Sequence, residues 1–257
     1  MRATRKRKPL HFEVFGLRSL PEIQQGERLG ARIARAAQEE GLPLHRGDIV
    51  IVAQKIVSKA EGRVVELAKV EPSALARTWA RRLRRDPRIV EIVLQESRRI
   101  LRMSERALIV ETRHGLICAN AGVDRSNVPN GWVTCLPADP DASARRIAAE
   151  LRRALGFAVP VVITDTFGRP WRLGLTNVAI GLHGMNAFED LRGSRDAHGH
   201  RLHATVMALA DEVASAAGLM MPKRARVPVA IVRGYSYPAG NWTAREILRP
   251  EREDLFR

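Results

Sequence analysis

The chain contains little cysteine, few aromatic residues and no long apolar run. Its two cysteines, Cys118 and Cys135, occur without a CxxC motif, so we expect reduced, buried thiols rather than a disulfide or a zinc site. No apolar stretch approaches the roughly 20 residues needed to span a bilayer. The basic start is not followed by the apolar region of a secretory signal. These absences predict a cytoplasmic protein without a membrane span, whose core is built from Val, Leu, Ile and Ala.

Two common nucleotide-binding motifs are also missing. No GxxxxGK[ST] occurs, which excludes a P-loop enzyme, and no GxGxxG follows a predicted strand, which argues against a Rossmann dinucleotide site. Any nucleotide must therefore be held in another way.

The chain has a strong excess of positive charge, with 43 Lys and Arg against 28 Asp and Glu and a net charge of +15. Such a field suits nucleic acid, anionic small substrates, or simply solvated helix faces rich in arginine. The arginine clusters, such as Arg81, Arg82, Arg84 and Arg85, lie in Ala- and Leu-rich helical contexts without interleaved aromatics. This pattern favours solvated faces, and nucleic-acid binding is the less favoured alternative.

The order of predicted elements favours an α+β fold. The pattern predicts helices over residues 27–40, 73–85, 141–155 and 202–219, and strands over 49–53, 89–94, 107–112, 115–120, 159–163 and 227–232. Because strands and helices alternate irregularly, without a βαβ repeat, we expect mixed sheets with flanking helices. Residues 1–10 are predicted to be a flexible basic tail, and residues 11–257 a single catalytic module, with two interleaved subdomains as the alternative arrangement.

The most informative segment follows the predicted strand over residues 159–163. This apolar run breaks at Thr164 and Asp165, where we expect the strand to end. Asp165 and Thr166 offer hard oxygen ligands for a divalent cation, and Arg169 and Arg172 suit an anion. An ordinary exit from a strand does not need paired arginines, so this segment predicts metal-assisted chemistry on a phosphate or a carboxylate.

A glycine-punctuated loop provides a second set of oxygen-bearing side chains, Asn120, Asp124, Ser126 and Asn127. Such residues often only cap their own turns. Together with Asp165, however, Asp124 gives a pair of carboxylates suited to magnesium or manganese, which usually also bind substrate phosphates.

The strand over residues 49–53 is followed by polar residues that include Gln54, Lys55, Ser58 and Lys59. The lysines are either solvated residues at a strand exit or ligands that neutralise nucleotide phosphates. His198, His200 and His203 lie around a glycine-bearing turn rather than on one helix face, and we interpret them as surface histidines.

Taken together, these segments resemble the coenzyme F420-0:L-glutamate ligase family, also called F420 γ-glutamyl ligases. The resemblance runs from about Val14 to the last residue. It is carried by GDIVIVAQKIVSKAEGR, ANAGVDRSNV, ITDTFGRPWRLG with NVAIG, DLRGSRD and RPEREDLFR. Some bacterial members are fused to a nitroreductase-like domain, and we expect this chain to be the stand-alone form.

The resemblance implies a GTP-dependent ligation of L-glutamate to the terminal carboxylate of coenzyme F420-0 through an acyl phosphate. It also implies Mn²⁺ or Mg²⁺ as divalent cations, an assisting K⁺ and an intertwined homodimer. Asp124 and Asp165 would hold the first metal and Thr166 would help to hold a second, while catalysis would involve Asp165, Arg169 and Arg172. The residues implied at the GTP site are Leu20, Pro21, Glu22, Ile23, Gln54, Lys55, Lys59 and Asn127.

One loop departs from the family pattern. Relatives carry glycine followed by Glu or Gln before the last core strand, where the loop supplies a ligand to the second metal. Here this loop contains Met221, Pro222 and Lys223. Pro222 has no backbone N–H to offer a phosphate, and a protonated Lys223 cannot bind a metal but can place a point charge on phosphates. A ligase with altered metal demand and a relative that accepts another amino acid or acceptor are both compatible with this loop.

Overall fold

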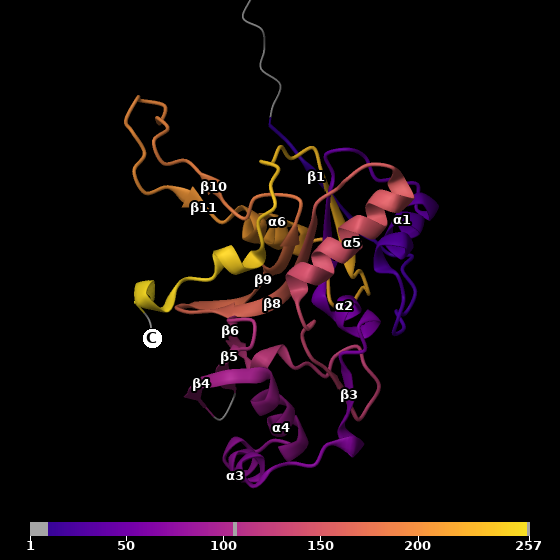
Figure 1. Cartoon of the computed structure of the whole chain (residues 1–257), viewed down its shortest axis with the longest axis vertical. Helices are drawn as coiled ribbons and strands as arrows, with labels where there is room; N and C mark the ends of the chain where they lie inside the picture. The colour runs from indigo at the N-terminus through magenta and orange to yellow at the C-terminus, as the bar shows by residue number, and fades with distance from the viewer. Residues whose placement is uncertain (1–9, 105–106, 256–257) are drawn as a thin grey trace, which may run out of the picture.

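A five-stranded sheet in the order β1-β12-β2-β8-β9 lies at the centre of the computed structural model, which describes residues 10–104 and 107–255 (Figure 1). Its strands are β1 (Glu13–Leu17), β2 (Ile49–Ala53), β8 (Val161–Arg169), β9 (Arg172–His183) and β12 (Val229–Arg233). Strands β2 and β8 are parallel, whereas all other neighbours are antiparallel. This mixed sheet with its flanking helices confirms the α+β prediction. The predicted basic tail, apart from Leu10, lies outside the described residues.

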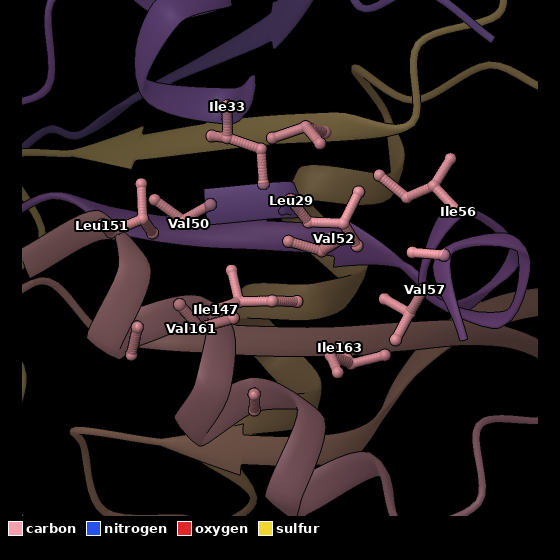
Figure 2. Packing of buried hydrophobic residues seen from close by; sticks show 14 of the residues in the cluster. Leu29, Ile33, Val50, Val52, Ile56, Val57, Ile147, Leu151, Val161 and Ile163 are labelled. Carbon is pink, nitrogen blue, oxygen red and sulfur yellow. The ribbon is translucent and has the colours of Figure 1, made fainter. Parts of the chain in front are cut away.

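The two faces of this sheet bury alternate residues of each strand, as the two-residue period of a strand requires. On one face, Val50 and Val52 pack against helices α1 (Leu29–Glu39) and α5 (Pro140–Leu155), as Figure 2 shows from close by. On the other face, Ile49 and Ile51 pack against α6 (Leu209–Gly218). The sheet is therefore covered by helices on both sides, and aliphatic side chains fill both interfaces.

Helices α1 and α5 approach closely at Gly30. The backbone N–H of Gly30 donates to Oε2 of the buried Glu150 at 2.8 Å. A Cβ atom at residue 30 would lie 2.5 Å from Cβ of Glu150 and 2.6 Å from the carbonyl oxygen of Ile147. Only glycine allows the two helices to pack at this separation.

Residues between α2 and α5 form a smaller lobe, drawn in purple and magenta in Figure 1. Its elements are β3 (Val64–Glu66), α3 (Ala74–Leu83), α4 (Pro87–Glu96), β4 (Ser97–Met103), β5 (Leu108–Thr112), β6 (Ile117–Ala119) and β7 (Trp132–Thr134). This lobe has its own apolar cluster, which includes Leu83, Val90 and Leu108. Strand β6 lies beside β8, so the lobe adjoins the central sheet next to Asp165.

Short elements complete the described chain. They are helix α2 (Gln54–Ala60), strands β10 (Glu189–Asp190) and β11 (Val206–Met207), and the 3-10 helices at Leu67–Lys69, Asn120–Gly122, Ala244–Ile247 and Glu251–Glu253. No helix in residues 10–104 or 107–255 combines the length and apolarity that a membrane crossing needs.

Away from the cavity, two sequence predictions of secondary structure are wrong. Residues 89–94 form helix α4 rather than a strand, because Asp86 caps the helix by accepting the N–H of Arg88 and Pro87 occupies the first turn. The helix predicted over residues 202–219 begins only at Leu209. Residues Val206–Met207 instead pair with Glu189–Asp190 as a short antiparallel ladder.

Candidate active site

A cavity of about 900 Å³ opens at the carboxyl ends of the parallel strands β2 and β8, where ligands of open α/β sheets commonly bind. It is lined by five segments, residues 18–23, 53–59, 124–129, 164–166 and 218–228, together with Asn177. The residues expected to bind metal or nucleotide line this cavity, whereas Arg169 and Arg172 and the polar candidates Asn120, Ser126 and Ser58 do not. The fold thus brings together residues that are far apart in the chain.

Asp165 is held in the cavity wall by the β8–β9 hairpin. The last pair between β2 and β8 is Ala53 with Thr164, and beyond this point β8 pairs only with β9, beginning with Asp165 opposite Val178. The prediction that the strand ends at Thr164 is therefore wrong. The apolar run stops where β2 stops covering β8, but the backbone stays extended because β9 continues to pair with it.

The surroundings of Asp165 favour its neutral form. Burial raises the pKa of Asp165 to about 6, and the nearby carboxylate of Asp124 also raises it. The backbone N–H of Thr166 and the positive charges of Lys223 and Lys55 act in the opposite direction. A bound cation would stabilise the ionised form of such a carboxylate, because the cation's charge offsets the free-energy cost of burying a negative charge.

Helix α2 presents two lysines to the cavity. Strand β2 runs directly into α2, so Lys55 and Lys59 stand four residues apart on one side of the helix. Nζ of Lys55 donates to Oδ2 of Asp124 at 2.7 Å and also to Oγ of Ser126, whereas Lys59 pairs with Glu22. The two lysine side chains are only 16% and 11% exposed. The interpretation of these lysines as solvated residues at a strand exit is therefore wrong.

The turn after residue 123 fixes the second carboxylate. Oδ1 of Asp124 accepts the backbone N–H of Ser126 at 2.8 Å, and Oδ2 accepts the Ser126 hydroxyl at 2.8 Å. Burial of Asp124 favours the neutral acid, but hydrogen bonds from Lys55 and Ser126 outweigh it, so the pKa of Asp124 lies below its ordinary value. Asp124 is thus both the cap of its own turn and a charged group of the cavity.

The donor set fits a hard divalent cation. The carboxylates of Asp124 and Asp165, the hydroxyl of Thr166 and the amide of Asn127 all line the cavity. Within the described part of the chain, no group of three or more His, Cys, Asp or Glu side chains forms a metal site from protein alone. A site with few protein oxygens and a large adjoining cavity suits Mg²⁺ or Mn²⁺, because these ions complete their coordination with water and substrate phosphates.

The two arginines expected beside Asp165 lie elsewhere. Arg169 and Arg172 face each other at the end of the β8–β9 hairpin, where both are exposed, and Arg169 donates to the carbonyl of Leu173 at 3.3 Å. An extended strand rises about 3.3 Å per residue, which places Arg169 roughly 13 Å along the strand from Asp165. Within one chain, these arginines are separated from the cavity.

The structure also adds cavity residues that the sequence patterns did not single out, among them Arg18, Asn177, Gly218 and Arg226. Asn177 lies on β9 opposite Thr166. A Cβ atom on Gly218 would lie 2.8 Å from Cγ of Asn177, so this glycine leaves room for the amide. The NVAIG motif contains Asn177, but only a prediction of β9 would have placed it across from Thr166.

The remaining sequence predictions concern His and Cys residues. His198, His200 and His203 are exposed, as predicted. Cys118 and Cys135 are free and buried, also as predicted. Burial and the charge of Asp165 raise the pKa of Cys118 to about 12, so it is a neutral thiol behind the cavity wall.

The fold and the cavity define an α+β protein whose polar site combines three carboxylates with several lysines. The model of the family described as F420-0:Gamma-glutamyl ligase matches residues 17–234. The coenzyme F420:L-glutamate ligase of Methanothermobacter thermautotrophicus is 41% identical over 249 residues, which cover 96% of this chain and 99% of the relative. Enzymes of the same name from Methanopyrus kandleri and Methanocaldococcus jannaschii are 43% and 39% identical, covering 92% and 95% of this chain and 94% and 96% of their own. The chain belongs to the F420-0:gamma-glutamyl ligase family.

Proposed function

We propose that this protein uses GTP to ligate L-glutamate to the terminal carboxylate of coenzyme F420-0, which forms a γ-glutamyl amide. The observation that carries the proposal is the cavity itself, where the carboxylates of Asp124 and Asp165 meet the ammonium groups of Lys55 and Lys59 in a chain of this family. The relatives named above are called coenzyme F420:L-glutamate ligases, which supports the choice of substrates.

The chemistry needs an activated carboxylate, because an amine does not displace oxide from a carboxylate ion. An oxygen of the acceptor carboxylate attacks the γ-phosphorus of GTP, GDP leaves, and an acyl phosphate forms. The amine of L-glutamate then attacks the acyl carbon, and inorganic phosphate leaves with the bonding electrons as the amine loses a proton. Catalysis of such phosphoryl transfer consists mostly of positioning and electrostatic stabilisation.

We assign the nucleotide to the side of the cavity formed by α2 and the segment over residues 20–23. Lys55 and Lys59 would bind its phosphates, since two fixed ammonium groups suit a polyanion. Gln54 is buried and its Oε1 accepts the hydroxyl of Ser58 at 2.8 Å, which orients its amide N–H groups. Leu20, Pro21, Glu22, Ile23 and Asn127 would border the nucleotide, as they also line the cavity.

Asp124, Asp165 and Thr166 would hold Mn²⁺ or Mg²⁺, with K⁺ as an assisting ion. A divalent cation bound there would neutralise charge on the transferring phosphoryl group. The protein's own contribution is to keep both carboxylates fixed at the cavity wall. Strand pairing holds Asp165, while Ser126 and Lys55 hold Asp124.

The test is an end-point assay by mass spectrometry on purified protein with F420-0, L-glutamate, GTP and Mn²⁺. A product one glutamyl unit heavier, formed by the wild type and not by Asp165→Asn, would support the proposal. Parallel reactions with ATP and with other amino acids establish nucleotide and amino-acid preference. If GTP binds with metal but no product forms, the acceptor or the amino acid is a different one. If neither binding nor product is seen, the ligase proposal fails, and salt-dependent binding to nucleic acid is the next measurement.

A further inference from the structure

The loop between α6 and β12, residues 221–226, brings positive charge into the cavity. Lys223 and Arg226 of this 221–226 loop both line the cavity, whereas Arg224 between them does not. The charge of Lys223 reaches Asp165, because it opposes the effect of burial on that carboxyl. Lys223 therefore lines the cavity within electrostatic reach of Asp165.

Lys223 differs from Lys55 and Lys59 in its partners. Lys55 is paired with Asp124 and Lys59 with Glu22, so each of their charges is already matched by a carboxylate. Among the described residues, the ammonium of Lys223 makes neither an ion pair nor a hydrogen bond. Its charge is thus available to an anion that enters the cavity.

A nucleoside triphosphate places several negative charges beside Asp165 and Asp124, and these repel one another unless cations lie between them. A divalent cation supplies such charge, and so does a fixed ammonium group that is not already paired. Pro222 restricts the backbone directly before Lys223, since its ring fixes φ. The lysine is therefore presented from a backbone of reduced freedom, which lowers the entropy lost when it binds a phosphate.

Building on the proposed function, we propose that Lys223 is a built-in cation of the nucleotide site. Its ammonium group binds the terminal phosphate of GTP on the Asp165 side of the cavity. There it supplies part of the positive charge that divalent cations would otherwise supply. Nucleotide binding by this protein consequently depends less steeply on divalent cations than it would without the lysine.

The chain offers a matched control for this proposal in Arg224. Both side chains are exposed in the same loop and carry one positive charge, but only Lys223 lines the cavity. Lys223→Gln and Arg224→Gln therefore remove the same charge from the same loop. Lys223→Glu reverses the charge. Its carboxylate would repel the phosphates of GTP unless a divalent cation lies between them.

The experiment measures GTP binding by titration calorimetry at a series of Mg²⁺ concentrations, beginning in EDTA. We expect Lys223→Gln to weaken binding in EDTA by about tenfold or more, since a hydrogen bond to a charged group is lost. The difference in GTP affinity between wild type and Lys223→Gln should become smaller as the Mg²⁺ concentration rises. Arg224→Gln should stay within about twofold of wild type throughout. Lys223→Glu should bind GTP only at high Mg²⁺, and melting curves should be the same for all variants because both positions are exposed.

Three outcomes would overturn the inference. Equal losses of GTP affinity for Lys223→Gln and Arg224→Gln would mean that GTP responds only to the total charge of the loop and not to the position of Lys223. A loss that is the same at every Mg²⁺ concentration would mean that Lys223 binds phosphate without replacing metal charge. Absence of GTP binding by the wild type, even with saturating Mg²⁺ and Mn²⁺, would instead overturn the proposed function and this inference with it.

Discussion

Nζ of Lys55 lies 2.7 Å from Oδ2 of Asp124, although the two residues are separated by 69 positions in the chain. The pair joins α2, which follows the central sheet, to the turn that precedes β7 in the smaller lobe. The lysine proposed to bind phosphate and the carboxylate proposed to bind the metal thus hold each other in place. The two parts of the proposed site are positioned before any ligand binds.

Replacement of Lys55 should therefore affect function more than folding. We expect Lys55→Met to lower kcat/KM by about a hundredfold or more, because one charged phosphate contact and the position of Asp124 are both lost. The free energy of unfolding, measured in urea, should change by about 1 kcal/mol or less, since the carboxylate of Asp124 stays partly solvated. Lys69→Met is the control, because Lys69 pairs with Glu66 while its side chain is 79% exposed. Equal losses of activity in the two variants would contradict this role.

Asp165 should reduce stability while it supports activity. Because its pKa in the folded protein is raised to about 6, the charged form is disfavoured by folding, and this cost is fully present above pH 6. As pH falls from about 6 towards 4, the folded protein takes up the proton first and the cost disappears. Asp165→Asn should therefore melt at a higher temperature than wild type at pH 8, with the difference lost near pH 4, yet be inactive. A variant that melts lower than wild type at pH 8 would contradict this account.

Local composition indicated the two aspartates and the lysines of α2, and the family resemblance added residues 20–23, but neither gave their contacts. Asp165 and Lys55 stand out because each comes within two residues of the end of a buried apolar run. Nothing in the sequence shows that Lys55 pairs with Asp124, since this contact depends on how the smaller lobe adjoins the central sheet. The pairing is a property of the tertiary structure, and sequence periodicity carries information only on local structure.

The errors in the sequence predictions also have physical causes. The end of the β8–β9 hairpin is exposed on both faces, so residues 168–175 show no burial pattern and resemble a loop, although each strand pairs with the other. That is why Arg169 and Arg172 were expected beside Asp165. The apolar run over residues 89–94 suits a strand or a helix equally well, and the cap at Asp86 decides for the helix.

The approach of α1 to α5 gives a test of the packing alone. Gly30→Ala would place a methyl group 2.5 Å from Cβ of Glu150 and 2.8 Å from the backbone nitrogen of Leu151, and backbone atoms cannot move aside without separating the helices. We expect a loss of about 1–3 kcal/mol in the free energy of unfolding, measured in urea. Arg32→Ala, on the exposed side of the same helix, should change it by about 0.5 kcal/mol or less. Similar free energies of unfolding for the two variants would show that α1 can move away from α5 without loss of stability.

The end of the β8–β9 hairpin carries exposed apolar side chains, with Leu173 99% and Leu175 62% exposed. Large apolar groups gathered at one exposed site are typical of protein interfaces. We propose that this hairpin packs against a second copy of the chain, in line with the homodimer expected from the family resemblance.

Sedimentation equilibrium tests this proposal. Leu173→Glu should convert a dimer of the wild type into a monomer, because burying a carboxylate in the interface costs free energy that burying leucine does not. The monomeric variant should have nearly the same urea midpoint of unfolding as the wild type, since Leu173 makes no core contact within its own chain. Leu75→Glu on α3 is the control, because Leu75 is also exposed, at 51%, but lies in the smaller lobe. A monomeric wild type, or a dimer that survives Leu173→Glu, would exclude the hairpin as the interface.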